Sequence, residues 1–297
     1  MTTSSWQPNP SLQHDFIMTN GVRLHYVTQG SGELMLMLHG FPEFWYSWRH
    51  QIPEFATDHK VVALDMRGYN DSDKPKDLAA YRMEQLVKDI EGVIRGLGYD
   101  RCILVGHDWG GAVAWNVAYT HPELVDRLIV LNLPHPAKLT EGFLKNPQQL
   151  LRSSYMFFFQ LPWLPEVVLQ SGDYQLVEEA FTRMAVNKAA FTQEDLEAYK
   201  DAASKRGALT AMLNYYRNLF QSGMWQQKWG KLRVPTLMIW GERDTALGVE
   251  LTYGTELYVE DFTIRYIPDA SHWVQQEKPQ LVNQYMREFL VAKQGVA

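Results

Sequence analysis

Cysteine is almost absent, since the 297 residues contain a single one, Cys102. One cysteine excludes an internal disulfide framework and any metal site built from several thiolates. Cys102 begins the apolar run 102–105, so we interpret it as a buried strand residue and not as a reactive thiol.

Long apolar runs are missing as well. No stretch reaches the roughly 18 consecutive apolar residues that a membrane-spanning helix needs. The longest candidate, 155–169, is interrupted by Gln160, Glu166 and two prolines. The first 16 residues have no basic segment followed by an apolar core, so we expect no signal peptide, no membrane span and a cytoplasmic location.

The charges are balanced and dispersed. The chain has 28 Lys and Arg against 34 Asp and Glu, a net charge of -6, and no run of one sign. This argues against nucleic acid or an anionic membrane as a partner. Hydrophobic residues at 46% and charged residues at 21% are ordinary globular values, and the length favours one large domain or one domain with an insertion.

Short apolar runs alternate with helical periodicity in the first part of the chain. Such alternation indicates a mainly parallel sheet with helices on both faces. The predicted strands are 22–27, 34–38, 61–64, 102–105 and 128–133, and the predicted helices are 83–97 and 112–119.

The pattern changes after residue 137. Residues 138–231 show helical patterns and no convincing strand, whereas strand patterns return at 234–240 and 262–267 and a last helix at 280–292. We therefore predict an α/β core of residues 1–137 and 232–297 with an inserted helical cap of residues 138–231. An insertion after a strand's carboxyl end lies where open α/β sheets bind ligands, so we expect the cap to act as a lid.

Gly106-His107-Asp108-Trp109-Gly110 follows a predicted strand and opens a predicted helix. This is the spacing of a nucleophile elbow, a strained turn that lifts one side chain above the sheet. Here that side chain is the carboxylate of Asp108, where esterases carry a serine. Taken alone, Asp108 could instead be a helix N-cap in an ordinary glycine-containing turn.

Two later segments strengthen the elbow interpretation. Asp244 follows the strand 234–240, and His272 lies on the loop after the last strand, 262–267. The order of nucleophile, acid and histidine is that of α/β-hydrolases. Each residue alone could be an ordinary loop residue, but their order and their positions after strands indicate a catalytic triad.

The loop 39–43, His-Gly-Phe-Pro-Glu, follows the strand 34–38. Backbone N–H groups of Phe41 and Trp109 would form an oxyanion hole beside Asp108. The Phe41-Pro42 bond is a candidate cis peptide, although an ordinary turn fits as well. His107 next to Asp108 could suggest a metal pair, but further ligands at recognisable spacing are missing, so we expect no metal and no cofactor.

These motifs resemble those of the α/β-hydrolase-fold epoxide hydrolases, and the match runs over nearly the whole chain. One departure is Asn70, where the family usually has glycine; Asn also tolerates a left-handed backbone, so we expect the loop to be retained. The matching segments are HGFPE at 39–43, DMRGYNDSDKP at 65–75, GHDWGG at 106–111, PHP at 134–136, SY at 154–155 leading to FQ at 159–160, NYYRN at 214–218, WGERD at 240–244 and SHW at 271–273.

The resemblance implies that Tyr155 and Tyr216 of the cap hold the epoxide oxygen, and the family's Tyr-Arg-Asn pattern selects Tyr216 over Tyr215. Without it, aromatic packing would be the better interpretation of both tyrosines. It also implies that Asp108 attacks a ring carbon of a small apolar epoxide, and that His272 then activates water to release a vicinal diol. The expected pocket walls are Phe41, Pro42, Trp109 and Trp273.

Two other functions stay open. A haloalkane or haloacid dehalogenase uses the same aspartate nucleophile, but its halide-binding Asn would lie at Phe41. The arginines and the His-Trp pair of fluoroacetate-type enzymes are not found beside Asp108 or at Tyr155-Met156. A non-catalytic binding protein would have lost a catalytic group, and none is missing. The physiological epoxide, the attacked carbon, the stereochemistry and the oligomeric state are not determined by the sequence.

Overall fold

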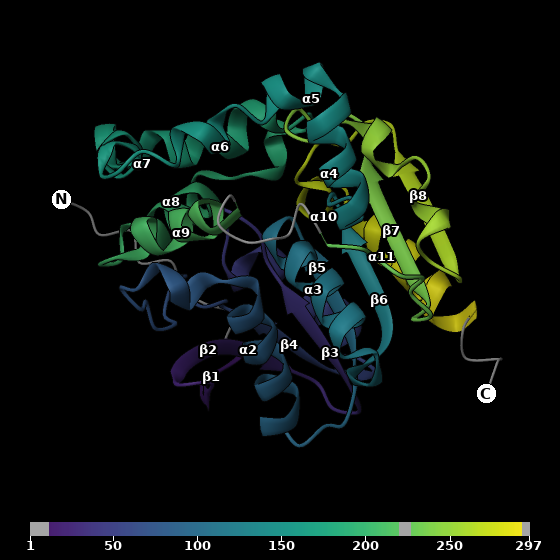
Figure 1. Ribbon diagram of the computed structural model, residues 1–297. Coiled ribbons are helices and arrows are strands. Elements are labelled where there is room, and N and C mark those ends of the chain that lie inside the picture. Colours follow the sequence, from purple (N-terminus) through teal and green to yellow (C-terminus); the bar gives the residue numbers. More distant parts are fainter. Residues whose placement is uncertain (1–11, 220–226, 293–297) are drawn as a thin grey trace.

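The computed structural model describes residues 12–219 and 227–292. Its centre is an eight-stranded sheet in the order β1-β2-β4-β3-β5-β6-β7-β8, with helices on both faces and a helical layer above one edge (Figure 1). The strands are β1 (Gln13–Thr19), β2 (Val22–Gln29), β3 (Glu33–Leu38), β4 (His59–Leu64), β5 (Cys102–His107), β6 (Val125–Leu131), β7 (Thr236–Gly241) and β8 (Phe262–Ile267).

Six neighbouring strands of the sheet are parallel, namely β4, β3, β5, β6, β7 and β8. Strands β1 and β2 form an antiparallel edge. The central strands are buried on both sides, which explains why β3 and β5 are continuous apolar runs. Because β3, β5, β6, β7 and β8 run in one direction, their carboxyl ends meet at the same edge of the sheet. The loops that carry the candidate site residues all start there.

Helices α2 (Met83–Gly96) and α3 (Trp109–Thr120) pack together on one face of the sheet. Helices α1 (Gln51–Phe55), α10 (Val274–Glu277) and α11 (Pro279–Ala292) cover the other face. The predicted strands and the helices α2, α3 and α11 are confirmed, with bounds that differ by a few residues. The short 3-10 helices are η1 (Trp45–Trp48), η2 (Leu78–Tyr81), η3 (Pro122–Leu124), η4 (Lys188–Ala190), η6 (Val249–Thr252) and η7 (Thr255–Leu257).

The cap is the layer of helices that follows β6 and lies over the carboxyl edge of the sheet (Figure 1). We use this name for α4 to α9. Residues 171–174 interrupt α7, and a reciprocal Thr192–Asp195 capping box starts α8. The helices are α4 (Pro136–Lys145), α5 (Pro147–Arg152), α6 (Tyr155–Phe158), α7 (Leu164–Met184), α8 (Gln193–Ser204) and α9 (Ala208–Leu219).

Hydrogen bonds between His135 and Tyr119, which we call the clamp, join the segment that leaves the core for the cap to the segment that returns from it. His135, which precedes α4, accepts the Ala137 N–H at Nδ1, which leaves Nε2 as the donor to the Tyr119 hydroxyl at 2.8 Å. That hydroxyl reaches the backbone carbonyl oxygens of Gly230 and Tyr258 at 3.1 and 3.0 Å. The chain therefore leaves the core and returns to it at neighbouring points.

Strand β1 was missed by the sequence pattern, because most of its side chains are exposed on both faces of an edge strand and give no alternation. Helix α4 begins two residues before the predicted cap boundary, and the division at residues 138 and 231 stays a prediction. The residues 1–11 behind the signal-peptide prediction lie outside the described residues. Among the residues that are described, no helix is long and apolar enough to cross a membrane.

Candidate active site

Asp108 stands in a strained backbone conformation between β5 and α3, with φ at 48° and ψ at -121°. A non-glycine residue in such a conformation costs about 1–3 kcal/mol, which the surrounding structure must offset. The two flanking glycines make the turn possible. A Cβ atom at Gly106 would lie 2.4 Å from the Gly110 carbonyl oxygen, and one at Gly110 would lie 2.2 Å from that of Leu38. The predicted elbow geometry is therefore present.

Asp108, His272 and Asp244 come together above the carboxyl edge of the sheet. Nε2 of His272 lies 3.5 Å from Oδ2 of Asp108, and Nδ1 lies 2.6 Å from Oδ2 of Asp244. All three side chains are buried. The arrangement has the geometry of a catalytic triad, with the histidine between the two carboxylates.

The two carboxylates determine the charge of the histidine. Burial alone would lower the pKa of His272, but Asp244 and Asp108 outweigh it and raise the pKa well above its ordinary value. Burial likewise opposes ionisation of Asp108, yet His272 and the Phe41 N–H outweigh this and lower the pKa of Asp108. At neutral pH the resting site therefore holds an imidazolium between two carboxylates.

Asn132, at the end of β6, fixes the orienting acid. Its Nδ2 donates to Oδ2 of Asp244 at 2.8 Å, and its Oδ1 accepts the Gly241 N–H at 2.8 Å. The other Asp244 oxygen, Oδ1, accepts the N–H groups of Ala246 and Leu247 at 2.8 and 2.9 Å. Sequence reasoning missed Asn132, although its place after a buried strand at the carboxyl edge was a usable signal.

The loop after β3 supplies a hydrogen-bond donor to the nucleophile. The Phe41 N–H donates to Oδ1 of Asp108 at 2.8 Å, and the Phe41-Pro42 bond is cis. Trp109 is the first residue of α3, so its N–H is one of the free donors of a helix N-terminus. Within the described residues that N–H makes no hydrogen bond to Asp108.

A buried contact between Glu43 and His107 holds this loop against the elbow. Oε2 of Glu43 accepts the Gly40 N–H at 2.9 Å and lies 2.7 Å from Nδ1 of His107. His107 also bonds the carbonyl oxygen of His272 at 2.8 Å through Nε2. Burial opposes ionisation of Glu43, but His107 and the hydrogen bonds around it outweigh this and lower the pKa of that carboxyl. The predicted structural role of His107 fits these contacts.

The two cap tyrosines face the nucleophile from α6 and α9. Tyr155 and Tyr216 lie against each other, with ring centroids 5.9 Å apart. Burial and the nearby carboxylates raise the pKa of Tyr155, while a hydrogen bond from Tyr216 opposes this. Burial also raises the pKa of Tyr216, and the Trp109 side chain opposes it with a hydrogen bond. Both hydroxyls therefore stay protonated and can donate.

Tyr215, the neighbouring tyrosine, points elsewhere, because its hydroxyl donates to the backbone carbonyl of Arg67 at 2.7 Å. This contact places Tyr215 in the packing between cap and core and leaves Tyr216 beside Asp108.

Two pockets meet at Asp108, Tyr155 and Tyr216, which line both. The wide pocket, of about 320 Å³, runs along α7, and the narrow pocket, of about 60 Å³, runs along α3 and α4. The predicted wall residues Phe41, Pro42 and Trp273 line the wide pocket, and Trp109 lines the narrow one. Apart from the triad and the tyrosine pair, nearly all the lining side chains are apolar.

The histidine loop is tied to the cap on both sides of His272. Glu277 in α10 accepts the N–H of the preceding residue, Ser271, at 2.9 Å and also its hydroxyl, while its other oxygen accepts the Asn187 N–H of the cap at 2.7 Å. The indole N–H of the following residue, Trp273, donates to the Ala180 carbonyl of α7 at 3.1 Å. Sequence reasoning missed Glu277, since nothing local distinguishes it from a surface glutamate.

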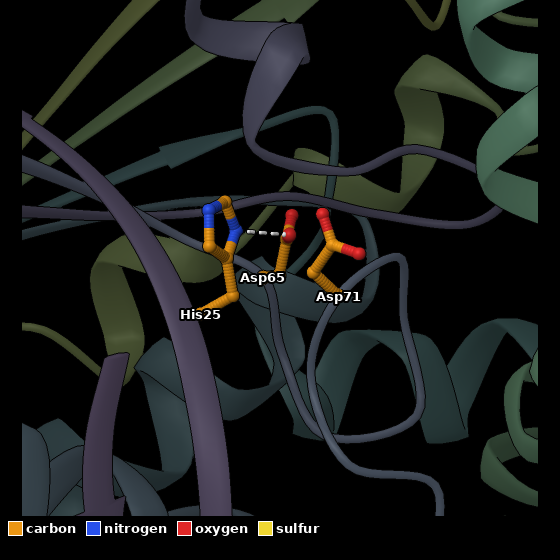
Figure 2. A group of neighbouring side chains, drawn as sticks. All are labelled: His25, Asp65 and Asp71. Atoms are coloured by element: carbon orange, nitrogen blue, oxygen red, sulfur yellow. Dashed lines mark hydrogen bonds and ion pairs between the residues drawn. The ribbon is translucent and has the colours of Figure 1, made fainter. Parts of the chain in front are cut away.

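One group of possible metal ligands lies elsewhere, at His25, Asp65 and Asp71, near the loop after β4 (Figure 2). Oδ2 of Asp65 already lies 2.6 Å from Nδ1 of His25 and accepts Asn70 Nδ2 at 2.7 Å, and Oδ1 accepts the Trp45 N–H at 2.9 Å. Because these donors would repel a cation, the cluster serves the fold. Asn70 has φ at 38°, the left-handed conformation that the sequence predicted.

The sheet, the elbow and the triad geometry define an α/β-hydrolase with an aspartate at the elbow, and the comparisons with known proteins agree on the fold. A family model described as alpha/beta hydrolase fold matches residues 33–279. Human epoxide hydrolase 4 is 44% identical over 281 residues, which are 92% of this chain and 77% of that protein. Epoxide hydrolase 3 of Xenopus tropicalis is 45% identical over 94% of this chain and 78% of that protein.

Among solved structures, an epoxide hydrolase from Bacillus megaterium in complex with an inhibitor superposes with a TM-score of 0.88 at 40% identity. The match covers 93% of this chain and 99% of that one. The chain belongs to the epoxide hydrolases of the α/β-hydrolase fold. Its activity is therefore the addition of water to an epoxide, and the dehalogenase alternative is not favoured.

Proposed function

We propose that this enzyme opens its epoxide through a covalent ester on Asp108 and releases the diol with water activated by His272 and Asp244. The proposal depends on one observation: the carboxylate–histidine pair and the two cap tyrosines lie around the same pockets. The buried Asp108 carboxylate lies 3.5 Å from His272, and the hydroxyl-bearing side chains of Tyr155 and Tyr216 line both pockets that reach it.

In the first step, Oδ2 of Asp108 is the attacking atom, because Oδ1 is held by the Phe41 N–H. The new bond joins Oδ2 to a ring carbon while that carbon's bond to the epoxide oxygen breaks. Tyr155 and Tyr216 donate hydrogen bonds to the oxygen as negative charge develops there, and one of them supplies its proton. A serine alkoxide would leave a stable ether at this point, whereas a carboxylate leaves a hydrolysable ester.

Ester formation changes the charge on His272. Asp108 loses its negative charge when it is alkylated, so one of the two carboxylates that raise the pKa of His272 disappears. The pKa of His272 falls, so the imidazolium can release its proton to restore the tyrosine that gave up its own, and the neutral ring can then accept a proton from water. The histidine thus becomes a base only after the intermediate has formed.

In the second step, the water activated by His272 attacks the carbonyl carbon of the Asp108 ester. Oδ1 is the oxygen that becomes negatively charged, and the Phe41 N–H already donates to it at 2.8 Å. We assign the second donor of this oxyanion hole to the Trp109 N–H, at the N-terminus of α3. Collapse of the tetrahedral intermediate breaks the bond between Cγ and Oδ2 of Asp108. Oδ2 leaves as one hydroxyl of the vicinal diol and takes the proton from His272, while the water oxygen completes the restored Asp108 carboxylate.

We further propose a small apolar epoxide as the substrate, with Phe41, Pro42 and Trp273 as walls of the wide pocket and Trp109 as a wall of the narrow one. The apolar lining of both pockets supports this class. We also propose a cytoplasmic location. The single buried thiol of Cys102 is compatible with a reducing compartment, and cell fractionation tests the location.

The test uses His272→Gln, which removes the base and should stop the second step. The variant is incubated with separate pools of epoxides and haloalkanes, weighed intact and mapped by peptide. The expected result is an adduct equal to the whole epoxide mass on Asp108. An adduct only from haloalkanes, lighter by the lost halide, would make the protein a dehalogenase, and an adduct at another residue would contradict the proposed nucleophile.

A further inference from the structure

Asn116 is the polar side chain in the narrow pocket that the catalytic steps do not use. It lies on α3. Asp108, just before this helix, and Ala112 and Asn116 within it follow one another at intervals of four residues and line the same pocket. This spacing places them along one face of the helix, with Asn116 about 12 Å beyond Asp108 along the axis. Apart from Asp108, Trp109 and the two tyrosines, its neighbours in the lining are aliphatic, aromatic, proline or methionine side chains.

The hydrogen-bonding capacity of this amide is only partly used. Nδ2 donates to the Ala112 carbonyl at 2.8 Å, which occupies one of its two N–H groups. Among the residues that the structure describes, none donates to Oδ1 of Asn116, although the side chain belongs to a residue that is only 6% exposed. A carbonyl oxygen and an N–H group are therefore available to a molecule inside the pocket.

The amide of Asn116 faces an otherwise apolar part of the pocket. Its Oδ1 is not among the fully buried polar atoms of the described residues that lack a partner, so a molecule inside the pocket can reach it. A hydroxyl matches the amide best, since it can donate to Oδ1 and accept from Nδ2 at the same time. An alkyl chain of the same length would leave both groups without a partner.

We propose that Asn116 is a specificity-determining residue that hydrogen-bonds a hydroxyl on the epoxide substituent in the narrow pocket, so that among otherwise apolar epoxides the enzyme prefers those that carry one hydroxyl on this substituent. This inference rests on the proposed function of Asp108 as the nucleophile. A substituent anchored at Asn116 also fixes which ring carbon faces Asp108, because the rest of the substrate must then extend into the wide pocket.

The test compares two series of epoxides with side chains of four to ten carbons, one ending in methyl and one in hydroxyl. For the wild type, kcat/KM should favour the hydroxyl compound at a particular chain length. The preference should fall by about tenfold or more in Asn116→Leu, which keeps the size and removes both polar groups. Asn116→Ala repeats the measurement in case the leucine variant does not fold, with circular dichroism as the check.

Leu139→Ala is the matched control, because it enlarges the same pocket without changing its polar groups. It should change the two series by the same factor. An equal hydroxyl-to-methyl ratio in wild type and both Asn116 variants at every length would overturn the proposal while diol formation continues. Absence of an Asp108 adduct in the His272→Gln experiment would instead overturn the proposed function, so the two failures are distinguishable.

Discussion

Replacing Glu277 with glutamine tests whether the cap positions the catalytic histidine. Glu277 is buried, and its two oxygens bond Ser271, next to His272, and Asn187 of the cap. Glutamine has the same shape, but its amide nitrogen cannot accept either N–H. In the wild type the N–H groups of Ser271 and Asn187 each face a carboxylate oxygen. In the glutamine variant one of these two N–H groups faces the amide NH₂ instead, whichever way the amide is oriented.

The magnitude follows from the bond that is lost. A hydrogen bond to a charged group contributes about 1.5–3 kcal/mol, and 1.4 kcal/mol corresponds to a factor of ten in rate. If the loss appears as displacement of His272 from its working position, hydrolysis of the ester slows by about 10- to 100-fold. Ester formation should change much less, because Asp108 itself is held by the elbow and Phe41.

The assay is a single-turnover reaction that is quenched at intervals and weighed intact, so that the rise and decay of the Asp108 ester are measured separately. Glu277→Gln should accumulate ester that the wild type does not. Glu250→Gln is the matched control, since Glu250 also joins core to cap, through Asn146 at 3.0 Å, but does not contact the histidine loop. Equal slowing of both steps, or the same behaviour in the control, would refute the reasoning.

Three further outcomes are expected. Asp108→Asn should lower the pKa of His272, measured by NMR titration of its ring, because one of the two carboxylates that raise it is gone; an unchanged pKa would contradict the switch in basicity. As a result, ester decay in the wild type should slow as the pH falls, while ester formation, which needs ionised Asp108, persists in quenched single turnovers. The double variant Tyr155→Phe and Tyr216→Phe should slow ester formation by about 100-fold or more and leave the melting temperature nearly unchanged. Asn132→Ala should lower the free energy of unfolding by about 1–3 kcal/mol in urea titrations and slow ester decay, since the triad acid loses a donor at 2.8 Å.

The sequence was sufficient for the parts of the site that depend on local order along the chain. The elbow around Asp108 has its own spacing, and Asp244 and His272 each follow a strand whose apolar run is readable. Parallel strands bring such positions to one edge, so the triad could be predicted without knowledge of any distance. Tyr155 and Tyr216 were available only through the family resemblance, because an aromatic residue in a helical cap usually serves packing.

The supporting residues could not be found in the same way. Glu277 lies in the polar stretch 275–280 and Glu43 in the aromatic stretch 41–48. Only folding shows that both are buried and bonded to the loops of the site. Their partners lie far away in sequence, as in the bond between Asn187 and Glu277, which are 90 residues apart. Hydrogen bonds between residues so far apart depend on how the cap packs against the core, and no local sequence pattern predicts that packing.

The clamp at His135 and Tyr119 has a consequence for the evolution of this enzyme. Since the chain departs and returns at neighbouring points, the cap closes a loop whose entropic cost rises only slowly with its length. Insertions, deletions or exchange of the helices between those points leave the strand order and the three triad positions of the core unchanged. New substrate ranges can therefore arise by remodelling one exchangeable segment, while the chemistry is inherited intact.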